Sequence, residues 1–333
     1  MGVAVGREVA VRVPGKINLG LRSGPRRADG YHCLTTVFQA VSVYDEVTVR
    51  PAAPGRIDIR VTGAAAAAVP TGPGNLAHQA ALELSRAFPS EGGLASGVGV
   101  GRGAAGEPTA GSASTLADSG RGAEIVIHKG IPVAGGMAGG SADAAAALLG
   151  LSLLWGIDAS GEQLARIAAK VGADVPFALR GETALGVNRG DVLTPALDRT
   201  TCHWLLVFSD EGLSTPAVFA KLDELRPNAA EPEVDDDLLA ALASGDSRRL
   251  GAALNNDLQA AAIAMRPELG EILRFGVESG AYGGVVSGSG PTVALLCASV
   301  GAAQELAARL SGEGLGHSTL CVTGPVCGAS VVE

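Results

Sequence analysis

The sequence predicts an α+β fold, in which strand and helix segments are mixed without the strict alternation of a doubly wound sheet. Three segments alternate apolar and polar residues as half-buried strands do, and several others repeat apolar residues at helical spacing. The chain has 333 residues, of which 47% are apolar, so it suits one large or two medium domains with a sizeable core.

The N-terminal part of the chain is predicted to hold three strands followed by a helix. The strands are expected at 8–13, 47–50 and 57–61, where the alternation is clearest. Asn75 is a typical N-cap residue, and the apolar residues after it share one helical face. From 90 to 122 the chain is rich in Gly, Ala and Ser, and it has no aromatic residue and no periodicity. We expect this segment to be a flexible, low-complexity surface insertion.

The rest of the chain carries helix and strand signals of ordinary length. The predicted strands lie at 124–133, at 203–209, and on both sides of the glycine turn within 285–297. The predicted helices lie at 141–156, 161–171, 271–280 and 302–314, and the last two end at glycines. The acidic segment 231–245 predicts a loop that leads into a helix. The apolar strand at 203–209 is where we expect a second domain to start.

Charge and composition exclude several classes of function. The formal charge is −9, and the densest basic cluster is Arg22, Arg26 and Arg27, which is too small for a nucleic-acid surface. It suffices for a phosphorylated small molecule. No apolar stretch approaches the ~18 residues of a membrane span, and no leader segment is evident. The five cysteines are odd in number and never spaced CxxC, so we expect a reduced, cytoplasmic enzyme without a disulfide framework or zinc site.

A glycine-rich loop just before the predicted helix at 141–156 is the most informative segment. Gly135, Gly136, Gly139 and Gly140 permit close approach of backbone amides to a ligand, and the helix N-terminus adds unpaired N–H groups. Together these features favour a phosphate site. Ser141 is placed to cap the helix or to contact a phosphate oxygen or magnesium. The loop is neither a Walker A motif nor GxGxxG, and glycines alone would equally suit an ordinary turn.

Three segments together resemble the GHMP kinases. The segment 132–143 (Pro-Val-Ala-Gly-Gly-Met-Ala-Gly-Gly-Ser-Ala-Asp) is similar to the ATP-binding signature of that family, with Met137 where leucine is usual. The segment 14–19 (Pro-Gly-Lys-Ile-Asn-Leu) resembles the first family motif, and 287–292 (Ser-Gly-Ser-Gly-Pro-Thr) resembles the third. The three motifs occur in the family order and span most of the chain.

The resemblance implies a two-domain GHMP kinase fold that binds ATP. Residues 1–195, which include the 90–122 insertion, would form an N-terminal ATP-binding domain like domain 2 of ribosomal protein S5. Residues 196–333 would form a ferredoxin-like C-terminal domain. Magnesium would arrive with ATP, because no His/Asp/Glu cluster in the sequence demands a protein-built site. The ATP-binding residues implied are Pro132, Val133, Ala134, Gly135, Gly136, Met137, Ala138, Gly139, Gly140, Ser141 and Ala142, with Asn75 and Lys129 near the adenine and ribose.

One branch of the family matches further. The segment 27–32 (Arg-Ala-Asp-Gly-Tyr-His), with 172–177, 213–219 and 256–258, resembles the members that phosphorylate the 2-hydroxyl of a cytidine diphosphate-linked methylerythritol in the non-mevalonate isoprenoid pathway. Homoserine and mevalonate kinases share the glycine loops but not 27–32. The alternatives are a GHMP kinase of the homoserine or phosphomevalonate type, or an inactive nucleotide-binding regulator on the same fold. We expect a monomer or homodimer that binds small molecules.

The same resemblance suggests residues for the cytidine end of the substrate. Tyr31 would stack on the pyrimidine, and His32 would hydrogen-bond its edge. Burial statistics alone would make them a core aromatic and a structural histidine. Phe219 would cover the other face of the cytosine or belong to the core. Asn18 would support Lys16 or contact the substrate.

Lys16 and Asp174 are the catalytic residues that the family motifs imply. Asp174 is followed by three apolar residues, a setting in which an unpaired carboxylate is costly. We expect Lys16 to pair with Asp174, which would accept the hydroxyl proton, while Lys16 stabilises developing charge. The alternative is a merely structural salt bridge. Asp143 is interpreted as an acid in the first turn of the helix, or otherwise a metal ligand. Asn256 and Asp257 match the family without an assigned role.

Overall fold

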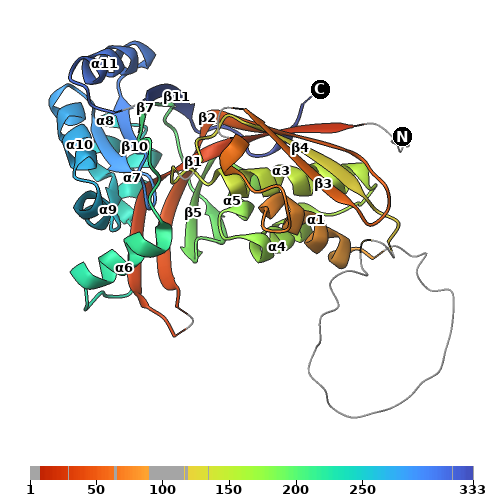
Figure 1. The fold of residues 1–333 in the computed structure, drawn as a ribbon. Helices are drawn as coiled ribbons and strands as arrows, with labels where there is room; N and C mark the ends of the chain where they lie inside the picture. Colours follow the sequence, from red (N-terminus) through yellow and green to blue (C-terminus); the bar gives the residue numbers. More distant parts are fainter. Residues whose placement is uncertain are drawn as a thin grey trace.

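The computed structural model describes residues 8–28, 30–63, 66–89, 116, 119–133, 135–316 and 318–332. Ala134 and most of the predicted 90–122 insertion lie outside these residues. The described chain forms two sheets with helices on their faces (Figure 1).

The first sheet has eight strands and is built on one long antiparallel hairpin. β1 (Val9–Arg26) and β2 (His32–Pro51) pair from Val9↔Val49 to Arg26↔His32. The main path of the sheet runs β12-β1-β2-β4-β3, while β5 pairs with β2 and β6, and β8 pairs with β1. The other strands are β3 (Ile57–Gly63), β4 (Ala123–Lys129), β5 (Thr183–Asn188), β6 (Val192–Pro195), β8 (Asn255–Asn256) and β12 (Ser330–Val331).

The hairpin is much longer than the predicted strands at 8–13 and 47–50. Residues of β1 from Val13 to Leu21 are all buried, because both faces of the strand are covered, so the apolar–polar alternation is lost there. The pairing with β2 also shifts register between Pro14 and Gly15 and between Asn18 and Gly20. Each shift moves the following side chains relative to the faces of the sheet.

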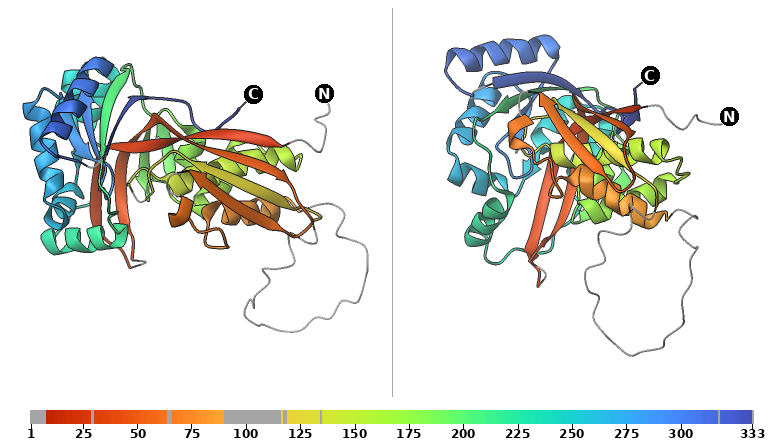
Figure 2. Two further views of the ribbon diagram at one scale, coloured as in Figure 1. Left: turned by 45° about the horizontal axis from the view of Figure 1, so that its top comes forward. Right: turned by 45° about the vertical axis from the view of Figure 1, so that its right-hand side comes forward.

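Four helices cover one face of this sheet (Figures 1 and 2). They are α1 (Leu76–Ala87), α3 (Gly139–Leu154), α4 (Gly161–Val171) and α5 (Val175–Arg180), with a short 3₁₀ turn η1 (Ala66–Ala68). The central helix α3 packs against the other three and against β1 and β2. Its run Ala144–Ala147 is fully buried, because small side chains let neighbouring elements approach closely. The helix predicted at 141–156 is confirmed, and its observed bounds are Gly139–Leu154.

The second sheet is antiparallel, with the order β11-β7-β10-β9. Its strands are β7 (Cys202–Phe208), β9 (Gly283–Val286), β10 (Val293–Cys297) and β11 (Ser318–Gly324). The helices of this half are α6 (Thr215–Leu225), α7 (Asp236–Ser244), α8 (Ser247–Ala253), α9 (Gln259–Met265), α10 (Glu268–Glu278) and α11 (Val300–Gly312). With α10 and α11 as the two crossover helices, the order is the βαββαβ pattern of a ferredoxin-like domain. The predicted α+β class is confirmed, and the second sheet has the ferredoxin-like pattern that we expected of the C-terminal part.

The two halves are joined by more than one crossing of the chain. The predicted boundary at 195/196 falls between β6, which belongs to the first sheet, and β7, which belongs to the second. Two strands that follow this boundary in the chain belong to the first sheet: Asn255 of β8 pairs with Gly20, and Val331 of β12 pairs with Val11. At the interface the buried Trp204 Nε1 donates to Gln39 Oε1 at 2.8 Å.

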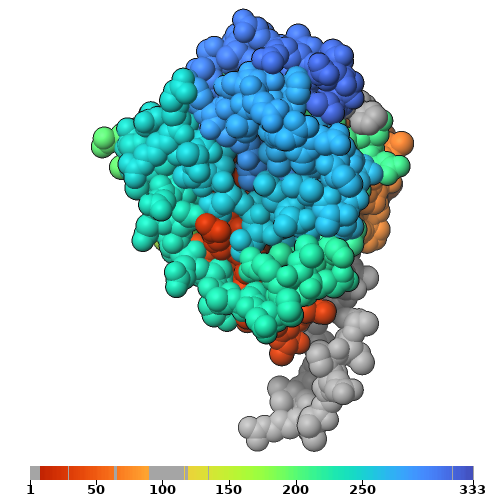
Figure 3. Space-filling view, turned by 90° about the vertical axis from the view of Figure 1, so that its left-hand side faces the viewer, coloured from red at the N-terminus to blue at the C-terminus, as the bar shows by residue number. Residues whose placement is uncertain are grey.

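The tip of the β1–β2 hairpin lies against the second half. Figure 3 shows the red hairpin at the floor of a hollow between teal segments. The hollow, about 700 Å³, is lined by Arg22, Ser23, Asp257 and residues between 226 and 237. Asp257 Oδ2 accepts from Ser23 N at 2.8 Å and pairs with Arg226 at 2.8 Å. These contacts give Asp257 a structural role that the sequence did not reveal.

No helix in the described part of the chain is long and apolar enough to cross a membrane. The five cysteines are all free thiols.

Candidate active site

The glycine loop packs against the third glycine motif through a glycine that cannot be replaced without strain. Gly136 has φ +75°, and a Cβ there would lie 2.2 Å from Ser287 O and 3.2 Å from Gly290 O. Ser287 Oγ donates to Gly136 O at 3.1 Å. Two segments about 150 residues apart are therefore held in contact by the absence of a side chain.

The helix that follows the loop starts without a side-chain cap. Its N-cap is Ala138, in the left-handed region at φ 58°, and Gly139 is its first residue. The prediction that Ser141 caps this helix is therefore wrong, because Ser141 already lies inside the first turn. Since an alanine cannot bond the first amides, they remain available to a ligand. Gly139 and Gly140 of this turn line a cavity.

This cavity, which we call the loop cavity, is about 320 Å³ in volume and brings the three glycine motifs together. Its lining residues are Lys16, Asn18, Leu21, Leu34, Thr36, Phe38, Pro132, Gly135, Gly136, Ala138, Gly139, Gly140, Asp174, Arg189, Thr215, Phe219, Leu258, Gly288 and Ser289. Of the other residues predicted to bind ATP, Met137 is buried beneath the loop, Val133 is exposed, and Ala142 is buried in the helix. Ala134 lies outside the described residues.

Lys16 is held at the floor of the loop cavity by hydrogen bonds. Its Nζ donates to Asn18 Oδ1 at 2.6 Å and to Gly136 O at 2.8 Å, while its backbone N donates to Met137 O. The residue is only 7% exposed. Burial lowers the pKa of the Lys16 ammonium, and the nearby charge of Asp174 opposes that shift. Asn18 is fixed in turn, because its Nδ2 donates to Thr36 Oγ1 at 2.8 Å.

Asp174 also lines this cavity and is the residue before α5. Its side chain does not cap α5 and is partly exposed. The direct ion pair expected between Lys16 and Asp174 is not among the ion pairs of the described residues, because the Lys16 ammonium is bonded to Asn18 and Gly136 instead. The two charged groups face one cavity from separate segments.

The third motif is shaped by a residue to which the sequence assigned no role. Asn256 Nδ2 donates to Val286 O at 2.8 Å and to Gly288 O at 2.7 Å. Gly288 has φ +56°, and a Cβ there would approach Lys16 Nζ at 3.3 Å and Asn18 Oδ1 at 3.2 Å. Asn256 therefore holds the turn that closes over the lysine.

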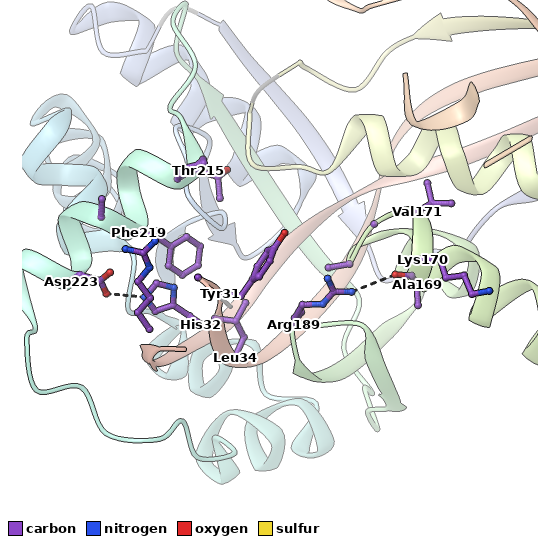
Figure 4. Close-up of a pocket in the computed structure, with 16 residues that line it drawn as sticks. Tyr31, His32, Leu34, Ala169, Lys170, Val171, Arg189, Thr215, Phe219 and Asp223 are labelled. Carbon is purple, nitrogen blue, oxygen red and sulfur yellow. Dashed lines mark hydrogen bonds and ion pairs between the residues drawn. The ribbon is translucent and has the colours of Figure 1, made fainter. Parts of the chain in front are cut away.

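A second cavity adjoins the loop cavity. We call it the aromatic cavity; its volume is about 540 Å³ (Figure 4). It is lined by Arg26, Gly30, Tyr31, His32, Leu34, Ala169, Lys170, Val171, Gly172, Ala173, Arg189, Thr215, Pro216, Phe219, Ala220 and Asp223. The structure thus brings Tyr31, His32 and Phe219 together from the hairpin tip and α6.

The rings in this cavity are arranged differently from the simple sandwich that we expected. His32 is buried and stacks on Phe219, with ring centroids 4.7 Å apart and an interplanar angle of 21°. His32 Nε2 is 2.8 Å from Asp223 Oδ1. Tyr31 is 57% exposed, so its ring is open to a ligand. No sequence pattern pointed to Asp223, and Arg189 could have been noticed only as part of an Asn-Arg-Gly-Asp turn.

Asn75, Lys129 and Asp143 also lie outside both cavities. Asn75 caps α1, with Oδ1 accepting from Ala77 N at 2.8 Å, as the helix prediction required. Lys129 Nζ contacts Asp45 and, at 2.9 Å, Asp143, and the Lys129 side chain is 2% exposed. Lys129 lines neither cavity, and its predicted place near the adenine and ribose stays a prediction. The interpretation of Asp143 as a first-turn acid is wrong, because the helix begins at Gly139 and Asp143 points inward.

The buried cluster of Asp45, Lys129 and Asp143 supports the glycine loop from below. Asp45 Oδ1 accepts from Gly130 N at 2.7 Å and from Ile131 N at 2.8 Å, which fixes the turn into the loop. Burial raises the pKa of the Asp143 carboxyl to about 7; Lys129 opposes this shift and Asp45 adds to it. With one proton on Asp143, the cluster of one lysine and two carboxyls is neutral.

Among the described residues, no group of three or more His, Cys, Asp or Glu side chains is placed to hold a metal ion.

Comparisons with known proteins agree with these motifs. Residues 108–182 match the model of the GHMP kinases N terminal domain, and residues 238–329 match that of the GHMP kinases C terminal domain. The chain is 49% identical to a 4-diphosphocytidyl-2-C-methyl-D-erythritol kinase of Nocardia farcinica, over 98% of this chain and 96% of the relative. It is 50% identical to the protein of that name from Thermobifida fusca, over 97% and 98% of the two chains.

Solved structures agree as well. A crystal structure of 4-(cytidine 5'-diphospho)-2C-methyl-D-erythritol kinase superposes with a TM-score of 0.68 at 28% identity, covering 94% of this chain and 98% of that one. A homoserine kinase from Cytophaga hutchinsonii gives a TM-score of 0.70 at 16% identity, covering 100% and 99%, which is a likeness of fold alone.

Replacing Gly136 by alanine should destabilise the protein. The left-handed backbone alone costs an alanine about 1–2 kcal/mol, and the approach to Ser287 O adds to that cost. Gly140→Ala is the matched control, because a Cβ there would meet only Leu76 Cδ1, at 3.8 Å. Urea unfolding should show a lower free energy of unfolding for Gly136→Ala and no loss for Gly140→Ala. Equal losses would contradict the proposed contact.

Asp143→Asn should change how stability depends on pH. The folded-state pKa of about 7 exceeds the ordinary 3.8, so the folded chain holds a proton that the unfolded chain releases as pH rises. The contribution of this carboxyl to stability therefore falls between about pH 4 and pH 7. The free energy of unfolding of Asp143→Asn, relative to the parent, should increase over this window and then level off. The exposed Asp158→Asn is the control, and a flat difference for Asp143→Asn would refute the shift.

Proposed function

Because the chain belongs to the GHMP kinase family, we propose that it transfers the γ-phosphoryl group of ATP to the 2-hydroxyl of 4-diphosphocytidyl-2-C-methyl-D-erythritol. The observation that carries this proposal is the adjoining pair of cavities. One is bordered by a helix N-terminus, a lysine and a carboxylate, and the other by aromatic rings. A nucleoside diphosphate-linked alcohol has both parts that such a pair would hold.

The loop cavity suits a triphosphate. Its border includes the uncapped first turn of α3, and the space beside Gly140 is open. Backbone amides of 135–141 would bind phosphate oxygens, with the helix dipole favouring their negative charge. When bound, ATP supplies the phosphoryl group, and magnesium carried by the triphosphate neutralises part of its charge. The Ser141 hydroxyl, in the first turn, is the side chain we propose to face the magnesium or a phosphate oxygen.

Lys16 and Asp174 would act on the acceptor alcohol. The acceptor oxygen forms a bond to the γ-phosphorus while the bond from that phosphorus to the bridging oxygen of ADP breaks, and the hydroxyl proton passes to the Asp174 carboxylate. Lys16 would stabilise the charge that develops on the transferred group. Its bonds to Asn18 Oδ1 and Gly136 O fix the ammonium before substrate arrives, so little reorganisation is needed.

The aromatic cavity would hold the cytidine. The open ring of Tyr31 offers a stacking face, and we propose that the stacked pair His32–Phe219 forms the opposite wall. The ring nitrogen of His32 that faces Asp223 is occupied, so its other nitrogen is the one available to the base edge.

Two other functions fit less well. Homoserine lacks a nucleotide, so it would leave the aromatic cavity without an occupant, although the fold is shared with a homoserine kinase. A regulator that only senses nucleotide would need neither Lys16 nor Asp174 at the loop cavity. A cytoplasmic location and a monomeric or homodimeric state remain further proposals.

Asp174→Asn should nearly abolish turnover while the protein still binds ATP. Loss of a general base costs about 10²–10⁴ in rate. The assay is ATP-dependent phosphorylation of 4-diphosphocytidyl-2-C-methyl-D-erythritol, run beside homoserine, with ATP affinity measured separately. Asp158→Asn, which alters an exposed carboxylate far from the motifs, should behave as the parent. Parental turnover by Asp174→Asn would overturn the role of the base, and phosphorylation of homoserine alone would overturn the choice of substrate.

A further inference from the structure

The two cavities share four lining residues, and only one of them is charged. These residues, which we call the junction, are Leu34, Arg189, Thr215 and Phe219. A ligand that extends from the aromatic cavity to the loop cavity must pass them. Whatever part of that ligand lies between its base and its reacting alcohol therefore lies beside the Arg189 guanidinium.

Arg189 is presented by a tight turn between β5 and β6. Asn188 and Gly190 on either side both have positive φ, +67° and +88°. A Cβ at Gly190 would lie 3.2 Å from Phe38 Cζ, so the backbone of this turn packs directly against the ring of Phe38 in β2. The conformation of the turn therefore restricts the direction in which the Arg189 side chain leaves the backbone.

The guanidinium is also fixed by a carboxylate. Arg189 Nη2 is 3.1 Å from Asp191 Oδ2, and Asp191 Oδ1 accepts from Arg189 N at 3.3 Å and from Asn188 Nδ2 at 3.1 Å. The side chain of Asp191 is 10% exposed and that of Arg189 is 38% exposed. Within the described part of the chain the side-chain hydrogen bonds of Arg189, to Asp191 and to Ala169 O, use Nη2. The donors on Nε and Nη1 remain for a ligand.

The same guanidinium lies over the ring of Tyr31, the proposed base-stacking residue. Its Cζ is 5.7 Å from the centroid of the Tyr31 ring, and Figure 4 shows the two side chains next to each other at the cavity wall. If the base of a nucleoside stacks on Tyr31, a diphosphate on the 5′ carbon of its ribose would lie within reach of the Arg189 guanidinium. In a chain of net charge −9, such local positive charge is what a diphosphate needs.

We propose that Arg189 binds the diphosphate of the acceptor nucleotide and so selects a nucleoside diphosphate-linked alcohol over an unphosphorylated one. The inference rests on the proposed function and adds a specificity-determining residue to it. The planar fork of arginine suits two phosphate oxygens at once, and the anchoring by Asp191 organises that fork before binding. The competing role is contact with the triphosphate of ATP, since Arg189 also lines the loop cavity.

The test compares the affinity of cytidine with that of cytidine diphosphate. Isothermal titration is performed on the parent, Arg189→Gln and Arg189→Lys, with the loop cavity saturated by a non-hydrolysable ATP analogue. Arg248→Gln is the matched control, because that arginine also lies over an aromatic ring, at 4.4 Å from the centroid of Tyr282, but lines neither cavity. Far-UV circular dichroism verifies that each variant is folded.

Arg189→Gln should weaken cytidine diphosphate binding by about 10–100-fold, as expected for a lost charge-assisted contact, and change cytidine affinity by less than about twofold. Arg189→Lys should lie between the parent and Arg189→Gln, and Arg248→Gln should match the parent. Equal losses for cytidine and cytidine diphosphate would mean that Arg189 acts only through Tyr31, and would overturn the proposal. The ATP analogue is titrated separately into each variant; a loss of affinity confined to it, or a parent that binds cytidine diphosphate no better than cytidine, would overturn the proposal as well.

The binding role of Arg189 and the proposed kinase activity can fail independently of each other. A parent that prefers cytidine diphosphate but does not phosphorylate the linked alcohol would sink the kinase proposal and leave the binding role of Arg189 standing. A parent that phosphorylates the alcohol, with an Arg189→Gln variant of unchanged KM for it, would sink the role of Arg189 alone.

Discussion

The contact between Gly136 and the 287–290 turn is the constraint on which the site depends. It requires a positive-φ glycine at 136, where a Cβ would meet Ser287 O and Gly290, and another at 288, where a Cβ would meet Lys16 and Asn18. Lys16 completes the arrangement, because its ammonium binds Gly136 O directly below the contact. Three segments from the beginning, middle and end of the chain thus meet at one point and together form the loop cavity.

Charge is distributed in this protein so that the site can be cationic while the molecule is acidic. Lys16 is buried and hydrogen-bonded at the floor of the loop cavity, Arg189 is anchored at the junction, and the α3 N-terminus adds its dipole. Lys129, in contrast, forms ion pairs with Asp45 and Asp143 under the glycine loop and lines neither cavity. The contribution of a lysine or arginine to the positive charge of the site therefore depends on which carboxylates lie beside it.

Much of this architecture could be predicted from the sequence, for identifiable reasons. Isolated amphipathic elements such as α1, with Asn75 as its cap, carry their own signals. The long hairpin β1–β2 does not, since both faces of β1 are buried and its register shifts break the alternation. Family motifs predict Lys16 and Asp174, but the sequence could not show that both line one cavity while the Lys16 ammonium bonds to Asn18 and Gly136. The partners of Lys129 and Asp143, and the anchoring of Arg189, depend on packing between distant segments that no local pattern encodes.

The central claim is that amides at the start of α3 grip a triphosphate while Asp174 meets the acceptor hydroxyl. A crystal structure with a non-hydrolysable ATP analogue, magnesium and 4-diphosphocytidyl-2-C-methyl-D-erythritol tests it most directly. We expect phosphate oxygens on the backbone of 135–141, and the 2-hydroxyl oxygen about 2.6–3.2 Å from an Asp174 carboxylate oxygen. A triphosphate bound away from that helix start, or an acceptor hydroxyl facing some other group, would contradict it.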